Sequence, residues 1–584
     1  MDPAAPCLVG VDYFPEHWPE ERWAEDVRLM REAGMRVVRI AEFTWSKTQP
    51  RYGVWDWAWL DRAVETIAGA GLKLILCTPT ACPPPWMVQE YPDILPVTTQ
   101  GRPMTLGQRR HYSPLHAGYR EACREIAEQL ALRYGSHPEV IGFQIDNELH
   151  GTIEDVGPLA QAAFHRWLKA RHGTLEALDR NLGLVFWSQQ YSNWSQIPVP
   201  ASASHHPGLR AEWCRFVSQA WTAFCRVQAD AMRPHIADRV LTTNCYLHRW
   251  GMEIDWHELM REGGLDLFAF DNYSNALHEN GYYSDLARSL STPHWILEQR
   301  CGDTRHHHIW PEPEVPLEEL TEAAARAGAK VITYFRWRQG LFGHEQDHGA
   351  VLDHHGRPGR MYGRVSDAIA RVAAAEPIDP PQPSTGIVFT WPDAWLSSSS
   401  PNSLHYRDLI LENAYRGVFE REGSGRFVLE PGQLEGLRTV LVAGKLIHDP
   451  DWEVALIDFA RGGGTLVAFP MLFAKDAFNK YRPEYLTPAL REVFGIEIER
   501  RILVREGHAV TAELEGAPLL LHTRVEELVP ASAEVLGRFS DGPLAGLPWI
   551  TRCRTGKGSA VYAAGYPDAD GMRAVLDRVA VRGD

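Results

Sequence analysis

Eight short apolar runs alternate with amphipathic helical patterns between residues 7 and 377 of this 584-residue chain. Each run is rich in Val, Ile, Leu or Phe, which is typical of parallel strands buried on both faces. Eight strands that alternate with eight helices predict a (β/α)8 TIM barrel. The expected strands are 7–13, 36–42, 73–79, 140–148, 239–246, 265–273, 294–300 and 330–338. The expected helices are 19–34, 55–71, 118–135, 209–235, 253–263, 282–291, 316–329 and 361–377.

A proline-rich linker at 377–383 ends this pattern, and a second strand and helix alternation begins at Thr385. It predicts a smaller doubly wound α/β domain at 385–497. From about residue 498 the pattern changes to short alternating strands, which indicate a small C-terminal β domain at 498–584. With the barrel at 1–377, the chain is therefore expected to hold three domains.

Two of the barrel runs lead to a glutamate, Glu148 at the end of the expected strand 140–148 and Glu298 after the apolar residues of the expected strand 294–300. Side chains at the carboxyl ends of barrel strands point into the mouth of the barrel. Two carboxylates that face one pocket are the minimal machinery for cleaving a glycosidic bond. A single strand-end glutamate can equally make a structural ion pair, but the pair favours catalysis. Arg39 and Tyr273, at two other strand ends, can donate to the carboxylate that stays ionised.

Composition narrows the class of protein further. The formal net charge of -16 argues against nucleic acid or an anionic membrane as a partner. No apolar run is long enough to span a bilayer, and the N-terminus lacks the features of a signal peptide. Nine scattered cysteines are typical of reduced thiols, so we expect a cytoplasmic enzyme. The 21 tryptophans suggest stacking on sugar rings or, alternatively, large hydrophobic cores.

Several segments in the barrel resemble those of the β-galactosidases of glycoside hydrolase family 42. They are Asp12–Trp18, Val38–Ser46, Gln144–Glu148, Phe186–Gln189 and Tyr334–Gln339, and they occur in the expected order. This resemblance implies an exo-acting, retaining enzyme that hydrolyses terminal β-D-galactosyl residues by double displacement. Glu148 is then the acid/base residue and Glu298 the nucleophile. The sugar is expected to be held by Arg39, Asn147, Trp187, Tyr273, Glu345 and His348.

The second domain resembles the glutamine-amidotransferase-like trimerisation domain of the same family. Glutaminase chemistry needs a cysteine nucleophile, and there is no cysteine between Thr385 and Arg500. We therefore expect an assembly module without activity of its own, and a homotrimer.

The chain departs from the family in two places. Some members bind zinc through cysteines just after the acid/base residue, but residues 150–157 contain none, so neither a metal nor another cofactor is expected. The loop after Glu298 contains His306, His307 and His308. Adjacent positions rarely converge on one metal ion, so we interpret this loop as a polar wall that changes sugar or aglycone preference.

Two alternatives stay open from the residues alone. A related retaining glycosidase could prefer β-D-fucosides or α-L-arabinopyranosides, which share the ring configuration of galactose and differ at carbon 6. A sugar-binding protein without catalysis is the other, although the presence of both glutamates counts against it. The natural substrate, its linkage and the oligomer number are not determined by the sequence.

Overall fold

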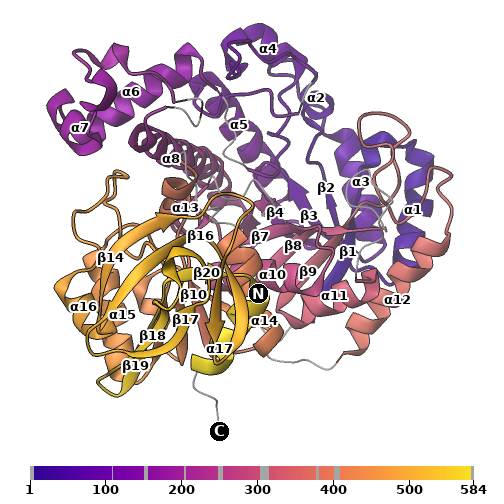
Figure 1. Cartoon of the computed structure of the whole chain (residues 1–584). Coiled ribbons are helices and arrows are strands. Elements are labelled where there is room, and N and C mark those ends of the chain that lie inside the picture. Colours follow the sequence, from indigo (N-terminus) through magenta and orange to yellow (C-terminus); the bar gives the residue numbers. More distant parts are fainter. Residues whose placement is uncertain are drawn as a thin grey trace. The chain divides into compact units, whose positions relative to one another are not determined.

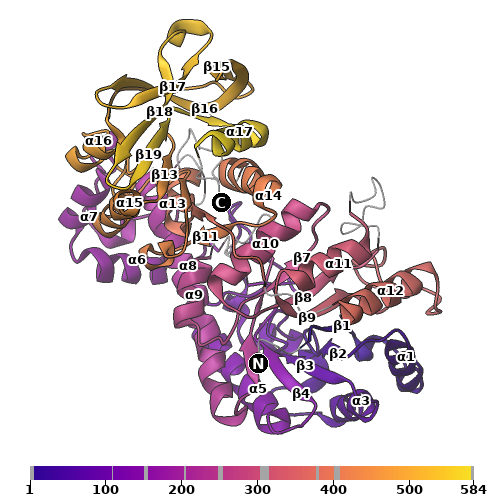
Figure 2. The same cartoon turned by 90° about the horizontal axis from the view of Figure 1, so that it is seen from below.

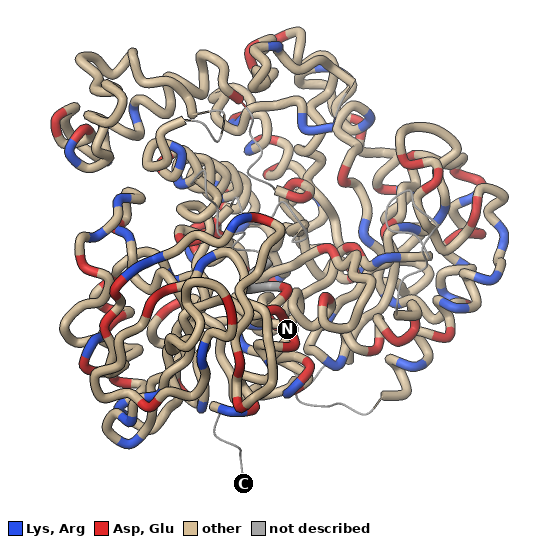
Figure 3. Tube along the Cα trace, viewed as in Figure 1, with Lys and Arg blue, Asp and Glu red and all other residues tan. Residues whose placement is uncertain are grey.

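The computed structural model describes residues 6–107, 109–149, 155–200, 202, 205–246, 254–302, 315–375, 380–399 and 408–579 (Figures 1 and 2). The chain forms two compact units. Unit 1 comprises Met1–Trp167 and Phe216–Pro380, and unit 2 comprises Leu168–Arg215 and Pro381–Asp584. Figure 3 shows acidic and basic residues interspersed along both units.

Unit 1 is built on a sheet of parallel strands with the order β5-β4-β3-β2-β1-β9-β8-β7-β6. The strands are β1 (Leu8–Asp12), β2 (Val37–Ile40), β3 (Lys73–Cys77), β4 (Val140–Gln144), β5 (Val240–Thr242), β6 (Asn244–Cys245), β7 (Ala269–Asn272), β8 (His294–Arg300) and β9 (Ala329–Phe335). Only Thr243 separates β5 from β6, so the two ends of the sheet are one interrupted strand. The sheet therefore closes into the eight-stranded barrel that the sequence predicts.

Helices follow the strands and cover the outside of the barrel (Figure 1). They are α1 (Glu20–Glu32), α2 (Trp45–Thr48), α3 (Ala58–Gly69), α4 (Pro85–Glu90), α5 (Ala117–Tyr134), α9 (Trp256–Glu262), α10 (Leu277–Leu290), α11 (Leu317–Arg326) and α12 (Arg360–Ala374), with 3-10 turns η1 (Pro15–His17), η2 (Pro92–Ile94) and η5 (Arg233–His235). Two further helices, α6 (Pro158–His172) and α8 (Pro207–Met232), contain the points at which the chain passes between the units. Every strand and helix expected in the barrel overlaps an observed one, so the predicted fold class is confirmed.

The inside of the barrel is packed with side chains from several strands. Trp295 of β8 is fully buried there among Val37, Ile75 and Val331. A Cβ atom at Gly142 of β4 would lie 2.7 Å from the Trp295 ring, so the glycine makes the space that the indole occupies. This dense core holds the strands in register, and the register determines which side chains meet at the mouth.

Unit 2 is built on one long mixed sheet. Five parallel strands form its first part: β11 (Arg426–Val428), β10 (Thr385–Val388), β12 (Thr439–Val442), β13 (Thr465–Ala468) and β19 (Gly558–Ala563). Antiparallel pairing continues through β18 (Pro548–Thr555), β17 (Glu534–Phe539), β15 (Val510–Leu514), β16 (Ala517–Pro530) and β14 (Ile496–Leu503), and β20 (Gly565–Pro567) pairs with β16. Strand β13 precedes residue 498 in the sequence and β19 follows it, so their pairing joins both predicted domains in one sheet. The division at that residue into two domains stays a prediction.

The helices of unit 2 are α7 (Leu175–Leu182), α13 (Trp391–Ser398), α14 (Arg416–Glu422), α15 (Pro450–Gly462), α16 (Pro488–Phe494) and α17 (Ala569–Val579). Short turns are η3 (Phe186–Ser188), η4 (Trp194–Gln196), η7 (Pro431–Leu434) and η8 (Gly542–Leu544), and η6 (Asp408–Tyr415) is a π-helix. Across the described ranges, no helix combines the length and the apolarity that a bilayer crossing requires.

Candidate active site

Glu298 lies in the second half of β8 and is 4% exposed. Its Oε2 accepts a hydrogen bond from the Tyr273 hydroxyl at 2.7 Å, and its Oε1 faces the Arg39 guanidinium at 3.4 Å. The amide of Asn244 also donates to Oε1, at 3.5 Å. Donors thus converge on both oxygens, as the sequence suggests for a carboxylate that works in its ionised form.

Glu148 follows β4 at the end of a tightly constrained segment. Asp146 and Glu148 both have positive φ angles, of 56° and 49°. The Asp146 carboxylate secures this backbone by accepting from Thr80 at 2.6 Å, from Tyr112 at 3.0 Å and from the Asn147 N–H at 2.8 Å. Strain of this kind persists only where surrounding contacts impose it. The segment therefore directs the Glu148 carboxylate in a way that an ordinary extended strand end would not.

The Glu148 carboxylate contacts two arginines. Its Oε2 accepts from Arg110 Nη2 at 2.5 Å and also from Arg109 Nη2. The side chains of Arg109 and Arg110 are 37% and 21% exposed. In this state the two guanidinium groups favour an ionised Glu148.

Carboxylate oxygens of Glu148, Asp271 and Glu298 all lie within 4.8 Å of one another. Burial, reinforced by the charge of Glu148, raises the pKa of Glu298 well above its ordinary value, while Arg39 lowers it. Two buried carboxyls this close cannot both ionise freely, so the pair holds a proton more readily than either group would alone.

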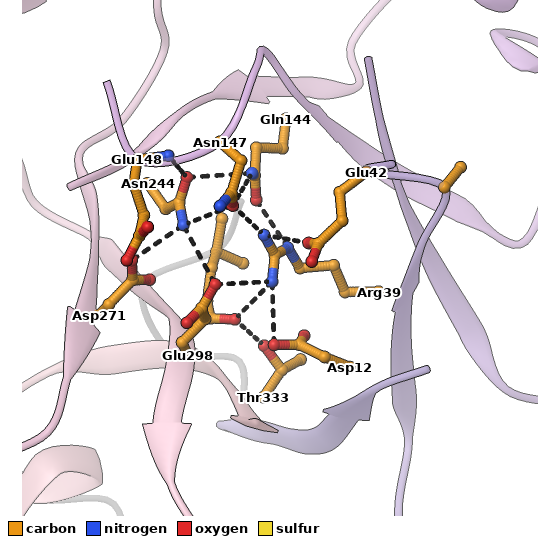
Figure 4. A network of polar contacts seen from close by, with 12 residues as sticks. Asp12, Arg39, Glu42, Gln144, Asn147, Glu148, Asn244, Asp271, Glu298 and Thr333 are labelled. Atoms are coloured by element: carbon orange, nitrogen blue, oxygen red, sulfur yellow. Dashed lines mark hydrogen bonds and ion pairs between the residues drawn. The ribbon is translucent and has the colours of Figure 1, made fainter. Parts of the chain in front are cut away.

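Arg39 of β2 is the centre of the polar network in Figure 4. Its side chain is completely buried, and its nitrogens donate to Gln144 at 2.7 Å, Asp12 at 2.9 Å and Asn147 at 2.7 Å. It also pairs with Glu42 and Glu298. Because protein acceptors engage all three of its nitrogens, Arg39 can orient the groups around it more readily than it can reach a sugar.

Asn147 is buried between these elements. Its Oδ1 accepts from Arg39 at 2.7 Å, from Asn244 at 3.0 Å and from Gln144 at 3.3 Å. With the oxygen held by three donors, the amide nitrogen is the atom that Asn147 can offer to a sugar hydroxyl.

Glu345 and His348 lie in the loop after β9, next to the same site. Glu345 Oε2 faces Arg336 at 3.5 Å, and its Oε1 is 3.9 Å from Arg109. His348 is 3% exposed, and its ring packs against the rings of Phe335 at 4.8 Å and Tyr273 at 5.9 Å. Its Nδ1 lies 3.1 Å from the Gly349 carbonyl oxygen. Donation to that oxygen makes Nε2 the acceptor of the neutral ring.

One predicted sugar-binding residue belongs to the other unit. Trp187 is in η3 of unit 2 and is 78% exposed, with a positive φ of 57°. Its role stays a prediction. His306, His307 and His308 lie outside the described residues, as do positions 150–154 of the stretch after Glu148.

Sequence reasoning missed four residues that lie beside the two glutamates themselves: Arg109, Arg110, Asn244 and Asp271. The two arginines precede Glu148 by 39 and 38 residues and lie outside any strand or helix. Asn244 and Asp271 are polar residues toward the carboxyl ends of strands that begin with apolar residues, and this was the signal that could have revealed them.

The three clustered carboxyls are also close enough to hold a metal ion. Their oxygens, however, already face the guanidinium groups of Arg39, Arg109 and Arg110 and the amide of Asn244. These donors disfavour a cation at the same place. The arrangement is suited instead to moving a proton and to attacking an electrophilic carbon.

Comparisons with known proteins identify relatives of this chain. Residues 12–375 match the family model described as β-galactosidase, and residues 383–583 match that of the β-galactosidase trimerisation domain. A β-galactosidase of Thermus thermophilus is 35% identical, and the match covers 92% of this chain and 86% of the relative. For the β-galactosidase Bga of Halorubrum lacusprofundi these values are 32%, 98% and 87%.

Two solved structures that resemble this chain are also β-galactosidases. The β-galactosidase of the Antarctic haloarchaeon Halorubrum lacusprofundi has a TM-score of 0.90 at 31% identity, covering 98% of this chain and 90% of that one. The cold-adapted β-galactosidase from Rahnella sp. R3 also has a TM-score of 0.90, at 27% identity, with 98% and 88% of the two chains covered.

Proposed function

The chain belongs to the β-galactosidases of glycoside hydrolase family 42 and hydrolyses β-galactosides with retention of configuration, and we propose that Glu298 is its nucleophile and Glu148 its acid/base residue. The observation that supports this pair as the catalytic one is the separation of the two carboxyls, which bring oxygens within 4.8 Å of each other. Retaining glycosidases need about 5 Å between these groups, because no water molecule stands between the nucleophile and the sugar.

In the first step, a Glu298 oxygen attacks the anomeric carbon of a terminal β-galactosyl residue. The bond from that carbon to the glycosidic oxygen breaks, and Glu148 gives its proton to the departing oxygen. Glu148 must therefore carry a proton when the substrate is bound. Since Arg109 and Arg110 favour its ionised form, we infer that the substrate weakens at least one of these contacts as it enters.

In the second step, Glu148 takes a proton from water and the resulting nucleophile attacks the same carbon. The ester bond to Glu298 breaks, and negative charge returns to the Glu298 carboxylate. Tyr273 and Arg39 lie where they can stabilise that charge, at 2.7 and 3.4 Å from the two oxygens. Two inversions at one carbon give net retention.

The sugar-binding set is part of the same proposal. The amide nitrogen of Asn147 suits the 2-hydroxyl, beside the reacting carbon, while Glu345 and His348 suit hydroxyls farther around the ring. Arg39 is assigned a positioning role, because it holds Asn147 and Glu298 together. Trp187 is retained as a candidate aromatic contact.

Azide rescue tests the two assignments against each other. In Glu298→Ala, kcat should fall by several orders of magnitude, and azide should give an α-galactosyl azide, because a single displacement inverts configuration. In Glu148→Ala, nitrophenyl galactoside should still form the covalent intermediate, and azide should then give the β-galactosyl azide. An α-product from Glu148→Ala and a β-product from Glu298→Ala would reverse the assignment.

Substrate preference is tested with a panel of nitrophenyl glycosides. We expect β-D-galactoside to have the highest kcat/KM, above β-D-fucoside and α-L-arabinopyranoside, in line with the names of the relatives. A higher value for either of the other two would replace galactose as the preferred sugar.

Assembly and location complete the proposal. The match to a trimerisation domain over 383–583 supports a homotrimer. Light scattering should give about three times the chain mass of 65.9 kDa, whereas the mass of a single chain would exclude the trimer. All nine cysteines are free thiols, which supports a reducing, cytoplasmic location.

A further inference from the structure

A third carboxyl group lies in the catalytic centre and has no part in the two-step mechanism. Asp271 belongs to β7, pairs in register with Glu298 on β8, and is fully buried. One of its oxygens lies within 4.8 Å of an oxygen of Glu148 and of an oxygen of Glu298. A group in this position must affect the charge of the catalytic pair.

The surroundings of Asp271 provide little to stabilise a negative charge. Its Oδ2 accepts one hydrogen bond, from Asn244 Nδ2 at 2.9 Å, and its Oδ1 is buried with no hydrogen-bond partner. Within the described ranges no arginine or lysine makes an ion pair with it, because Arg39 pairs with Asp12, Glu42 and Glu298 instead. A buried carboxylate with one donor and no cation carries a large desolvation penalty.

The nearest charged neighbours increase that penalty. Burial, then the charges of Glu298 and Glu148, raise the pKa of Asp271 well above its ordinary value, and Arg39 and Asn244 oppose this only in part. The single donor, the burial and the neighbouring negative charges therefore all favour a protonated, uncharged Asp271.

We propose that Asp271 is a positioning residue that keeps a proton on Oδ1 and stays uncharged beside Glu148 and Glu298, an inference that rests on the roles proposed above for that pair. As a neutral acid it accepts from Asn244 through Oδ2 and offers an O–H donor through Oδ1. It limits the negative charge at the site to the two groups that react. It also lets Asn244, which contacts Asn147 and Glu298 as well, stay in place throughout the reaction.

Infrared difference spectroscopy tests the protonation state directly. The spectrum of wild type minus that of Asp271→Asn, recorded near neutral pH, should contain the carbonyl stretch of a protonated carboxylic acid. Asp26→Asn is the matched control, because Asp26 is equally buried but is ion-paired with Arg22 at 2.9 Å. The spectrum of wild type minus that of Asp26→Asn should therefore lack the protonated-acid band. Loss of carboxylate bands alone in Asp271→Asn would overturn the proposal. This measurement needs no turnover, so it can fail independently of the nucleophile and acid/base assignments.

Kinetics test the positioning role. Asp271→Ala should lower kcat by about tenfold, because the buried Asn244 amide loses its acceptor and is left with an unsatisfied donor. Asp271→Asn should recover most of that loss, since its amide supplies both the acceptor and the donor of the neutral acid. The two limbs of its pH profile should stay in place, whereas a shift of about one pH unit would mean that a negative charge had been removed. Melting temperatures show whether the Ala variant folds, and the infrared result on the Asn variant holds in either case. Loss of wild-type activity on treatment with a chelator would overturn the proposal in favour of a bound cation.

Discussion

Removing the hydroxyl of Tyr273 tests how the nucleophile is controlled. In the structure this hydroxyl donates to Oε2 of Glu298 at 2.7 Å, and both groups are buried. Burial and the charge of Glu298 raise the pKa of Tyr273 well above its ordinary value, so it remains a donor throughout the working pH range. Tyr273→Phe removes this one contact and preserves the ring that packs near His348.

The size of the effect follows from that contact. A hydrogen bond to a charged acceptor contributes about 1.5–3 kcal/mol. Since the bond stabilises the ionised form, its loss raises the pKa of Glu298, and at about 1.36 kcal/mol per unit the rise is about 1–2 units. Protonated Glu298 cannot attack, so the acid limb of the kcat/KM profile should move to higher pH by that amount. In the second step the Glu298 carboxylate departs with its charge, so hydrolysis of the intermediate should slow by roughly 10- to 150-fold.

The assay is a pH profile with nitrophenyl galactoside, together with pre-steady-state measurement of the nitrophenol burst. A larger burst is expected in the variant, because its second step becomes slower relative to its first. Tyr334→Phe is a matched control, since Tyr334 is a buried barrel tyrosine whose hydroxyl bonds to Thr321 at 2.7 Å, away from the catalytic pair. If Tyr273→Phe left both the acid limb and kcat as they are in the control, the contact would have no influence on the nucleophile.

Arg110→Ala removes a cation 2.5 Å from the acid/base carboxylate and should move the alkaline limb of kcat/KM upward by about one pH unit; an unmoved limb would show that this arginine does not affect the titrating group. Both ring nitrogens of His294 are buried without a hydrogen-bond partner in the described chain, and burial lowers its pKa to about 3. This folded-state pKa lies below the ordinary value, so the stability due to neutral His294 is present above about pH 6.5 and is lost toward pH 3, at up to about 1.4 kcal/mol per unit. Urea unfolding of His294→Phe at pH 7 and 5 should show a weaker pH dependence than wild type, and equal dependence would contradict the reasoning. Gly142→Ala brings a Cβ within 2.7 Å of the Trp295 ring and should cost about 1–3 kcal/mol in the same assay, whereas Gly359→Ala, which meets open space, should not. Chelator treatment should leave kcat and the melting temperature unchanged, and stoichiometric zinc in the purified protein would refute this.

Local sequence patterns were sufficient to predict the barrel. The alternation of apolar runs with amphipathic helices is a property of neighbouring residues, and it requires no knowledge of long-range contacts. The same applies to Glu148 and Glu298, because a parallel barrel brings the carboxyl ends of all its strands to one mouth. Their proximity therefore followed from their positions on the strands.

The roles of the neighbouring residues depend on tertiary structure. Arg109 and Arg110 reach Glu148 from an irregular segment whose path no periodic pattern describes. The family resemblance implied Arg39 as a sugar ligand, and the structure adds that the register of β2 against its neighbours surrounds its guanidinium with protein acceptors. The charge state of Asp271 depends on burial and on two glutamates, Glu148 after β4, 123 residues earlier in the chain, and Glu298 in β8, 27 residues later. Chain order determines which groups reach the mouth of the barrel, whereas distances between side chains and their exclusion from water determine which groups hold protons, and those quantities arise only when the chain has folded.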